Sequence, residues 1–541
     1  MKRRKAIVSL LLATTLTAGI LAGCGKNDGA QSSGPAAESG ETAENAEDYT
    51  LTLPLVDEPT TLSIFMPMNE TYSIYSKNWS DSEFFKEMEK RTGVSIEFIT
   101  PSMGDEVNAF NLMIASGQLP DIITWAGTYS EGAAAAIDDE YFLDLTPYLD
   151  TYLKDYNKVR TASDKVKKDT TLDDGRIAGI YEIRTGTEGP WCGYQVRKDW
   201  LDDLGIDTPV TFDDWEVMLT KFKEEKGAYA PLSLPGTGYD FYSTFSSGFG
   251  AASGYINQDG KAVYGPAQDS WRDFLSTAND WYAKGLIDPD FMTASPYFVD
   301  MEMISSEQSG AWYGINTITS AYKAAAPGSD IVAVPNPVKK AGDVTHTRCG
   351  DSVATTDQFT AICATSDKKE LAMKWLDYLF TEEGSMLAGY GIEGVSYTIG
   401  DDGQIAWTDQ VLNNPDGYGY DTAYRIYALP PSILPSWYHY DREFLMMGKD
   451  EMDAYDIWGS DTELDDWNMP AVTMTREEGN EYAKYYADIE SYMNECTLKF
   501  ITGTMDVNGA DWDTYVKTLE GMNLDKCTEL QQAALDRYNA R

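Results

Sequence analysis

The sequence is poor in the residues on which many catalytic and metal sites depend. Of 541 residues only two are histidine, His346 and His439, and six are cysteine. No CxxC, HExxH or GxSxG motif occurs, so nothing favours a zinc site, a thioredoxin-like redox pair or a serine hydrolase. We therefore expect no metal, no cofactor and no histidine-based catalysis.

Basic residues are also scarce. Lysine and arginine number 42 against 87 acidic residues, which gives a formal net charge of −45. A field of this sign repels nucleic acids, anionic headgroups and phosphorylated polyanions. We expect no nucleic-acid partner, and the excess of acid is typical of a protein surface that must stay soluble.

Long apolar runs are absent after the first residues of the chain. Residues 2–5 are basic, residues 6–21 are mostly apolar, and the segment 21–24 reads LAGC. This is the pattern of an export signal with a lipobox, cleaved before a cysteine that is then acylated. A membrane-spanning helix is the alternative, but the run is short for a span and threonine and glycine interrupt it. We predict a signal peptide over 1–23, lipidation at Cys24, and a chain anchored on the extracytoplasmic face of the cell membrane.

The segment that follows the lipobox has no apolar periodicity. Residues 24–50 are mostly small, polar and acidic, which predicts a flexible linker. If Cys24 carries the lipid, five cysteines remain, and an odd number cannot all pair internally. Isolated buried thiols are the default, with bridges Cys349–Cys363 and Cys496–Cys527 left open.

The order of elements from residue 61 onward predicts a parallel α/β sheet. Strands are expected at 62–65, 94–98 and 121–125, separated by helices at 84–92 and 109–116. A capping box is expected at 80–83, before the first of these helices. A further strand is expected at 177–181, and amphipathic helices at 368–380, 477–500 and 510–538. Thr211 is expected to cap a helix whose buried face includes Trp215 and Phe222.

Aromatic residues are abundant, with 14 tryptophans, 35 tyrosines and 18 phenylalanines. A flat ring matches the apolar face of a sugar, so part of this surplus suits a carbohydrate site. Ligands of parallel sheets lie outside the carboxyl ends of the strands. Trp125 and Tyr129 follow a predicted strand directly, which makes them candidate ligand contacts, with core packing of Trp125 as the alternative.

Several segments, in order, resemble the extracellular solute-binding proteins of ABC importers, in the carbohydrate-type family 1. The similar segments are ASGQLPDII at 115–123, LDLTPYL at 143–149, VRKDWL at 196–201, GLIDPDF at 285–291, AMKWLDYLFTEE at 372–383, YGIEG at 390–394 and FITG at 500–503. The last three resemble the large Firmicutes-type lipoprotein subgroup. The resemblance covers about residues 60–541.

The resemblance implies a type II periplasmic-binding-protein-like fold, with two α/β lobes joined by a hinge and a ligand cleft between them. We expect an N-terminal lobe of 51–188 plus about 350–410. We expect a C-terminal lobe of about 189–349 plus 411–541. In maltose-binding relatives the DIIxWA segment supplies a sugar-stacking tryptophan, which corresponds to Trp125, and a small-residue–Trp turn of the second lobe corresponds to Trp312. Further candidates, for each of which packing is the alternative, are Trp79, Trp191, Arg348, Trp437 and Tyr438.

These observations predict a lipid-anchored binding protein, not an enzyme, that delivers an oligosaccharide to ABC permease subunits. One alternative is a binding protein for a peptide or a polyol. Another is an extracellular glycoside hydrolase, because acidic pairs such as Asp173–Asp174 and Asp465–Asp466 occur, but adjacent carboxylates do not establish two catalytic groups across a cleft. The acidic turns at 257–260 and 401–403 are too short for EF-type calcium loops and predict hairpin turns.

Overall fold

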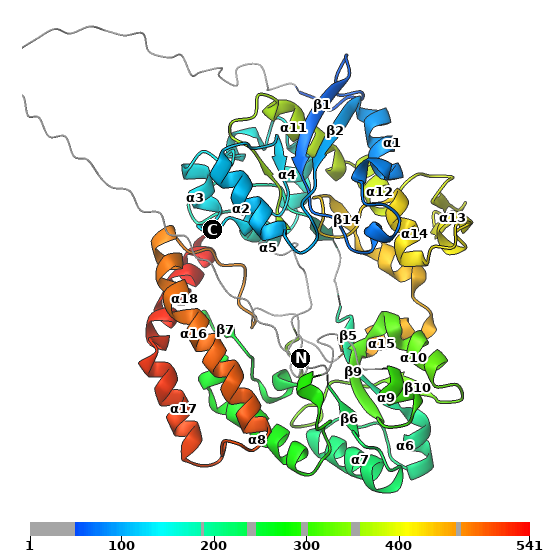
Figure 1. The fold of residues 1–541 in the computed structure, drawn as a ribbon, viewed down its shortest axis with the longest axis vertical. Helices are drawn as coiled ribbons and strands as arrows, with labels where there is room; N and C mark the ends of the chain where they lie inside the picture. The colour runs from blue at the N-terminus through cyan, green and yellow to red at the C-terminus, as the bar shows by residue number, and fades with distance from the viewer. Residues whose placement is uncertain (1–48, 186–188, 235–244, 294–300, 348–357, 461–466) are drawn as a thin grey trace, which may run out of the picture. The chain divides into compact units, whose positions relative to one another are not determined.

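The computed structural model describes residues 49–185, 189–234, 245–293, 301–347, 358–460 and 467–541. Two four-stranded sheets organise this part of the chain (Figure 1). The predicted signal peptide, Cys24 and most of the linker lie outside the described residues, as do Arg348 and Cys349.

The first sheet has the strand order β11-β3-β1-β2. Its strands are β1 (Thr60–Phe65), β2 (Val94–Ile99), β3 (Ile122–Ile123) and β11 (Ala361–Ile362). β1 runs parallel to both β2 and β3, and β11 joins β3 antiparallel. The parallel arrangement predicted for 62–125 is therefore confirmed, with α1 (Glu83–Thr92) and α2 (Glu106–Ser116) as the connecting helices.

Two local predictions in this region are wrong. The helix α1 does not begin with a capping box, since the side chain of Ser82 makes no cap bond and Asn78 instead accepts from the backbone N–H of Ser80. Residues 177–181 form a single bridge, Ile180 to Thr360, rather than a strand. A continuous apolar run marks 177–181 as buried, but burial alone does not provide a pairing partner along the whole segment.

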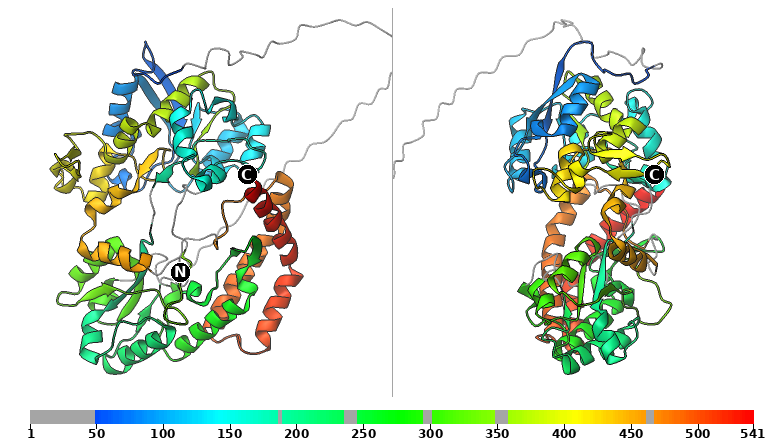
Figure 2. Two further views of the ribbon diagram at one scale, coloured as in Figure 1. Left: turned by 180° about the vertical axis from the view of Figure 1, so that it is seen from behind. Right: turned by 90° about the vertical axis from the view of Figure 1, so that its right-hand side faces the viewer.

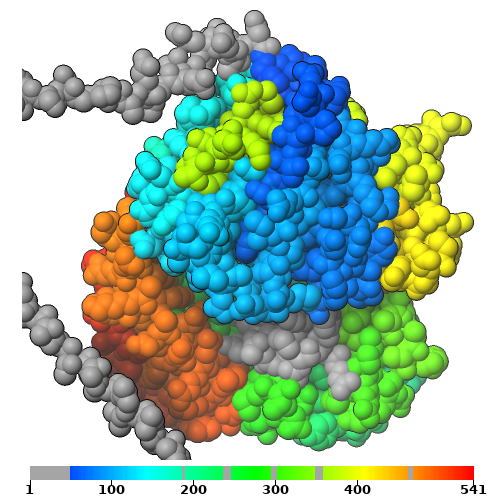
Figure 3. All heavy atoms as spheres, turned by 45° about the horizontal axis from the view of Figure 1, so that its top comes forward, coloured from blue at the N-terminus to red at the C-terminus, as the bar shows by residue number. Residues whose placement is uncertain are grey.

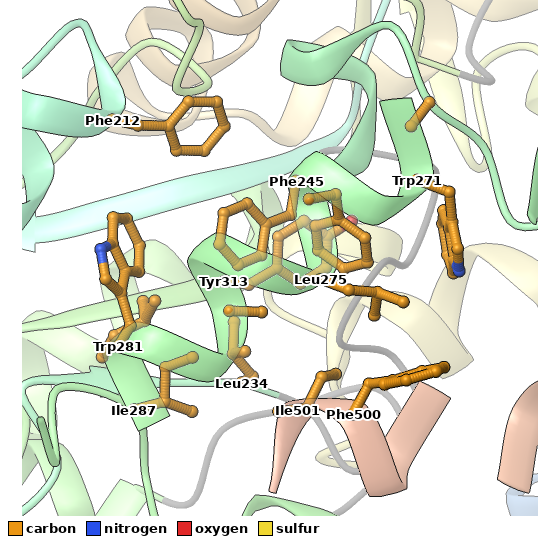
Figure 4. Packing of buried hydrophobic residues seen from close by; sticks show 14 of the residues in the cluster. Phe212, Leu234, Phe245, Trp271, Leu275, Trp281, Ile287, Tyr313, Phe500 and Ile501 are labelled. Atoms are coloured by element: carbon orange, nitrogen blue, oxygen red, sulfur yellow. The ribbon is translucent and has the colours of Figure 1, made fainter. Parts of the chain in front are cut away.

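The second sheet has the order β10-β5-β9-β6. Its strands are β5 (Cys192–Arg197), β6 (Leu232–Ser233), β9 (Ala311–Ile315) and β10 (Ile331–Ala333). α7 (Phe212–Glu225) begins with the predicted capping box, in which Thr211 and Asp214 bond each other's backbone N–H groups. One face of this helix and of α8 (Asp269–Ala283) enters a large aromatic core that includes Trp271, Trp281 and Phe245 (Figure 4).

Three long helices close the described chain. They are α16 (Arg476–Ile501), α17 (Ala510–Gly521) and α18 (Leu524–Ala540), and they run beside one another in both views of Figure 2. The helix predicted at 510–538 is broken after α17, where Asn523 adopts a left-handed φ of 68°. Residues Phe500, Tyr515 and Leu535 of these helices belong to the core of the second sheet.

Small strand pairs complete the fold. β4 (Ile183–Thr185) pairs in parallel with β14 (Trp437–His439), and we call this the β4–β14 pair. β7 (Tyr255–Gln258) and β8 (Lys261–Tyr264) form one antiparallel hairpin. β12 (Tyr397–Ile399) and β13 (Ile405–Trp407) form another, in the yellow segment at the surface in Figure 3. The two acidic turns are therefore hairpin turns, as predicted, and no group of three or more His, Cys, Asp or Glu side chains among the described residues is placed to hold a metal ion.

The remaining helices are shorter or lie between these elements along the chain. They are α3 (Ala133–Asp138), α4 (Lys154–Arg160), α5 (Asp164–Asp169), α6 (Lys198–Leu204), α9 (Met301–Ser305), α10 (Thr319–Ala325), α11 (Lys369–Asp377), α12 (Glu382–Tyr390), α13 (Asp409–Leu412), α14 (Tyr420–Tyr427) and α15 (Lys449–Ser460). None of the helices in the described ranges is both long enough and apolar enough to cross a bilayer.

Residues from a distant part of the chain contribute to the core of the first sheet. Leu429, Ile433 and Leu434 pack in the same buried cluster as Leu62 and Trp375. The resemblance implies a second lobe that includes residues 411–541, and these three residues do not follow that assignment.

The cysteines do not form the bridge that was left open at the C-terminal end. Cys496 and Cys527 are separate buried thiols. Burial raises the pKa of Cys527 to about 11. Such a thiol stays protonated at neutral pH, and it behaves as a small apolar side chain of the core.

Candidate ligand-binding site

Trp125 lies at the carboxyl edge of the first sheet, two residues after β3. Its backbone adopts a left-handed conformation with φ of 54°. Its indole Nε1 donates a 3.3 Å hydrogen bond to the backbone oxygen of Ser432, and the next residue, Ala126, donates its N–H to the oxygen of Phe359. The side chain is partly exposed. The ring is thus held at the strand end rather than packed beneath the sheet.

A left-handed backbone is costly for a bulky residue. Only glycine adopts it without a steric penalty, and other residues lose about 1–3 kcal/mol. Such a conformation persists where the surrounding contacts impose it, and such positions cluster at ligand sites. The backbone of Trp125 is therefore the feature that most clearly separates this tryptophan from those of the two cores.

Tyr129 lies in the same loop, but its hydroxyl is already committed. It donates a 2.7 Å hydrogen bond to Asp139, and its ring packs edge-on against Tyr141. Burial and the bond to Asp139 raise the pKa of Tyr129. The bond from Tyr129, together with Arg476 at 2.6 Å, lowers the pKa of the Asp139 carboxyl. Tyr129 offers a ligand its partly exposed ring more readily than its hydroxyl.

Trp437 and Tyr438 lie on β14. Trp437 is partly exposed, and its ring lies 5.2 Å from that of His439. Tyr438 is buried, and its hydroxyl bonds both Arg442 and Glu443. Burial raises the pKa of Tyr438 well above its usual value. Tyr438 is therefore a packing residue rather than the predicted ligand contact, and Trp437 is the residue of the two that is partly exposed.

Two of the predicted sugar contacts lie in the cores instead. Trp79 is 1% exposed, stacks on Tyr72 at 4.4 Å and donates its indole N–H to the oxygen of Pro67. Trp312 is 0% exposed and packs edge-on against Tyr322 of α10. Neither ring has a surface that a ligand can reach in this structure, so Trp79 and Trp312 are packing residues rather than the predicted sugar contacts.

The two remaining predicted ligand contacts are Trp191 and Arg348. Trp191 is partly buried, packs against the core of the second sheet, and its backbone oxygen accepts from Asn316 at 3.0 Å. Arg348 lies outside the described residues.

The acidic pairs do not form a catalytic arrangement in the described structure. Asp173 accepts from both Arg537 and Arg541, at 2.5 Å and 2.6 Å. Burial alone would raise the pKa of Asp174, but hydrogen bonds from Arg176 lower it below the usual value. Both carboxylates are thus occupied by arginines, and Asp465–Asp466 lies outside the described residues.

A small void lies in the second core. It has a volume of about 10 Å³ and is lined by apolar side chains such as Leu234, Phe245 and Ile501 (Figure 4). A void of this size holds at most one water molecule, and its lining offers no polar partner. It is a packing defect rather than a ligand site.

The sheets, each with its own helices and core, define a type II periplasmic-binding-protein-like fold with two α/β lobes. The alginate-binding protein AlgQ2 has this fold, with a TM-score of 0.69 and 23% identity over 89% of this chain and 99% of that chain. An extracellular solute-binding protein from Bifidobacterium longum subsp. infantis aligns with a TM-score of 0.72 and 19% identity, over 89% of this chain and 98% of that chain.

The profile of the bacterial extracellular solute-binding protein family matches residues 76–386, and the chain belongs to this family. It is 24% identical to the fructooligosaccharide ABC transporter substrate-binding protein FusA of Streptococcus pneumoniae, over 97% of each chain. It is also 25% identical to lipoprotein LipO of Bacillus subtilis, over 63% of this chain and 68% of LipO. The resemblance read from the sequence is confirmed, and the family is one of extracellular binding proteins rather than enzymes.

Proposed function

We propose that the protein binds an oligosaccharide between its two lobes and delivers it to the permease of an ABC importer. The observation that carries this proposal is the partly exposed indole of Trp125, fixed at the carboxyl edge of the first sheet by its bond to Ser432. A flat ring held in this way offers an apolar face to the C–H groups of a sugar. The similarity to FusA along nearly the whole chain supports a carbohydrate as the solute.

The negative charge of the protein favours a neutral glycan over an acidic one. FusA is named for fructooligosaccharides, which are neutral, whereas a second relative, YtcQ of Bacillus subtilis, is named for polygalacturonan and rhamnogalacturonan. A net charge of −45 opposes the approach of a polyuronate at low ionic strength. A neutral oligosaccharide is therefore the expected ligand.

The proposal includes an anchor and a division into lobes. Acylation of Cys24 would hold the protein beside its permease, and the linker would let it dock. The first lobe would comprise about 51–185 and 358–446, because Leu429, Ile433 and Leu434 share the core of the first sheet. The second would comprise about 189–347 and 449–541. Mass spectrometry of the membrane fraction tests the anchor, which would be refuted by an unmodified N-terminus on freely released protein.

Isothermal titration calorimetry tests the ligand class. The purified protein is titrated with kestose, a panel of other neutral oligosaccharides, oligogalacturonates and peptides. We expect binding of a neutral glycan with a Kd between about 1 nM and 1 μM, which corresponds to a favourable binding free energy of roughly 8–12 kcal/mol. Binding of peptides with no response to any glycan would overturn the carbohydrate assignment. Binding of oligogalacturonates alone would overturn the argument from charge.

A further inference from the structure

Trp125 is bonded to a second residue with a strained backbone. Ser432 has a φ of 61°, also in the left-handed region. The two residues lie 307 positions apart and are joined by the bond from the Trp125 indole to the Ser432 oxygen. Two strained residues in contact require something that holds the second of them in place.

Glu182 holds Ser432 in place through a hydrogen bond to its backbone. One of its carboxylate oxygens accepts the backbone N–H of Ser432 at 2.9 Å, and the other accepts Nε of Arg184 at 3.2 Å. The glutamate is 3% exposed. A buried carboxylate is tolerated when it is paired and hydrogen-bonded, and here both oxygens have a partner. The backbone of Ser432 therefore makes two hydrogen bonds, in which its N–H donates to Glu182 and its oxygen accepts from Trp125.

The same glutamate connects Trp125 to the β4–β14 pair. Arg184 lies on β4, directly opposite Tyr438 of β14, and its guanidinium stands 5.1 Å from the centre of the Tyr438 ring. Arg442 bonds the hydroxyl of Tyr438 at 2.7 Å and is itself buried. These contacts extend from the indole of Trp125 to a buried arginine without a break.

The β4–β14 pair lies where the chain passes between the sheets. β4 is followed, after residues 186–191, by β5 of the second sheet. β14 leads to α15, which packs against β10 and β5. Any rotation of one lobe against the other must be accommodated in such connecting segments.

We propose that Glu182 is a positioning residue, which sets the indole of Trp125 through Ser432 and ties it to the strands that join the lobes. The inference rests on the proposed function, because it gives the orientation of Trp125 a role in ligand capture. When Glu182 loses one of its bonds, the Ser432 peptide is released and the ring loses its fixed orientation. The ligand must then order the ring on binding, which lowers affinity.

The test uses the full protein labelled with 5-fluorotryptophan and observed by ¹⁹F NMR. The Trp125 resonance is assigned by its loss in Trp125→Phe. Glu182→Gln keeps the size of the side chain but has one acceptor oxygen, so either Ser432 or Arg184 faces an NH₂ group. We expect the Trp125 resonance to shift or broaden without ligand, and the Kd for the bound glycan to rise about tenfold.

A second buried carboxylate serves as the matched control. Asp377 is 1% exposed and accepts the backbone N–H of Tyr156 at 2.8 Å, in the core of the first sheet. Asp377→Asn is expected to leave the Trp125 resonance and the Kd unchanged, whatever it does to stability. If Glu182→Gln does not fold, Glu182→Asp keeps the charge but is too short to reach both partners, and a smaller shift of the same resonance is expected.

The outcomes separate the two proposals. An unchanged Trp125 resonance in folded Glu182→Gln, or an equal shift in Asp377→Asn, overturns the positioning role. If no glycan binds the unsubstituted protein, the carbohydrate proposal fails, while the ¹⁹F comparison without ligand still decides whether Glu182 sets Trp125.

Discussion

Trp125 and Trp312 were both expected to stack on a sugar, but they differ in their place relative to a strand, in their burial and in the partner of the indole N–H. Trp125 comes after its strand, is partly exposed and bonds the Ser432 oxygen through its indole N–H. Trp312 is inside β9 and fully buried, and its indole N–H has no hydrogen-bond partner among the described residues. A ring at a strand's end is available to a ligand, whereas a ring within the strand belongs to the core.

The largest expected effect is on stability, from Trp312→Ala. The change removes a fully buried ring between β9 and α10, which should lower the free energy of unfolding by about 3–5 kcal/mol. Urea denaturation followed by circular dichroism measures it. Trp312→Phe keeps most of the ring and removes an unpaired N–H, so it should cost much less. A stable Trp312→Ala protein with lost glycan affinity would reverse the roles assigned to the two tryptophans.

The next effect is on binding, from Trp125→Ala. Loss of the stacking face should weaken glycan binding by about 2–3 kcal/mol, roughly a 30- to 150-fold rise in Kd measured by calorimetry. The free energy of unfolding should change by less than in Trp312→Ala, because the ring is only partly buried. An unchanged Kd would remove Trp125 from the site.

A smaller effect is expected from Trp125→Phe. The substitution keeps an aromatic face but deletes the bond to Ser432, which is worth about 1 kcal/mol. The ligand must then order the ring on binding, so we expect the Kd to rise about tenfold, as in Glu182→Gln, between the values of the unsubstituted protein and Trp125→Ala. If Trp125→Phe binds as weakly as Trp125→Ala, the indole N–H matters more than the stacking face.

The smallest effect is expected from Tyr129→Phe. The hydroxyl bonds Asp139, so its removal should cost stability about 0.5–1 kcal/mol and leave the Kd unchanged. Thermal unfolding and calorimetry on the same sample measure both quantities. A marked loss of affinity would show that the hydroxyl exchanges Asp139 for the ligand.

The sequence predicts the three parallel strands of the first sheet, β1, β2 and β3, because strands and helices alternate locally there, but it does not predict β11. The sequence does not show that Trp125 is partly exposed while Trp312 is buried. All but the last residue of β9 are buried, since Trp312 packs under α9 and α10 while Tyr313 faces the other core. A strand covered on both faces has no polar alternation from which burial can be read. The contacts of Trp125 with Ser432, and of Ser432 with Glu182, join residues hundreds of positions apart, and no periodic pattern encodes them.

The most direct test of the account observes both tryptophans while the ligand binds. Protein labelled with 5-fluorotryptophan is titrated with the glycan that calorimetry identifies, and the two resonances are assigned by Trp125→Phe and Trp312→Phe. The account predicts that the Trp125 resonance moves with the same Kd as the heat of binding and that the Trp312 resonance stays in place. Movement of Trp312 with an unchanged Trp125 would contradict it.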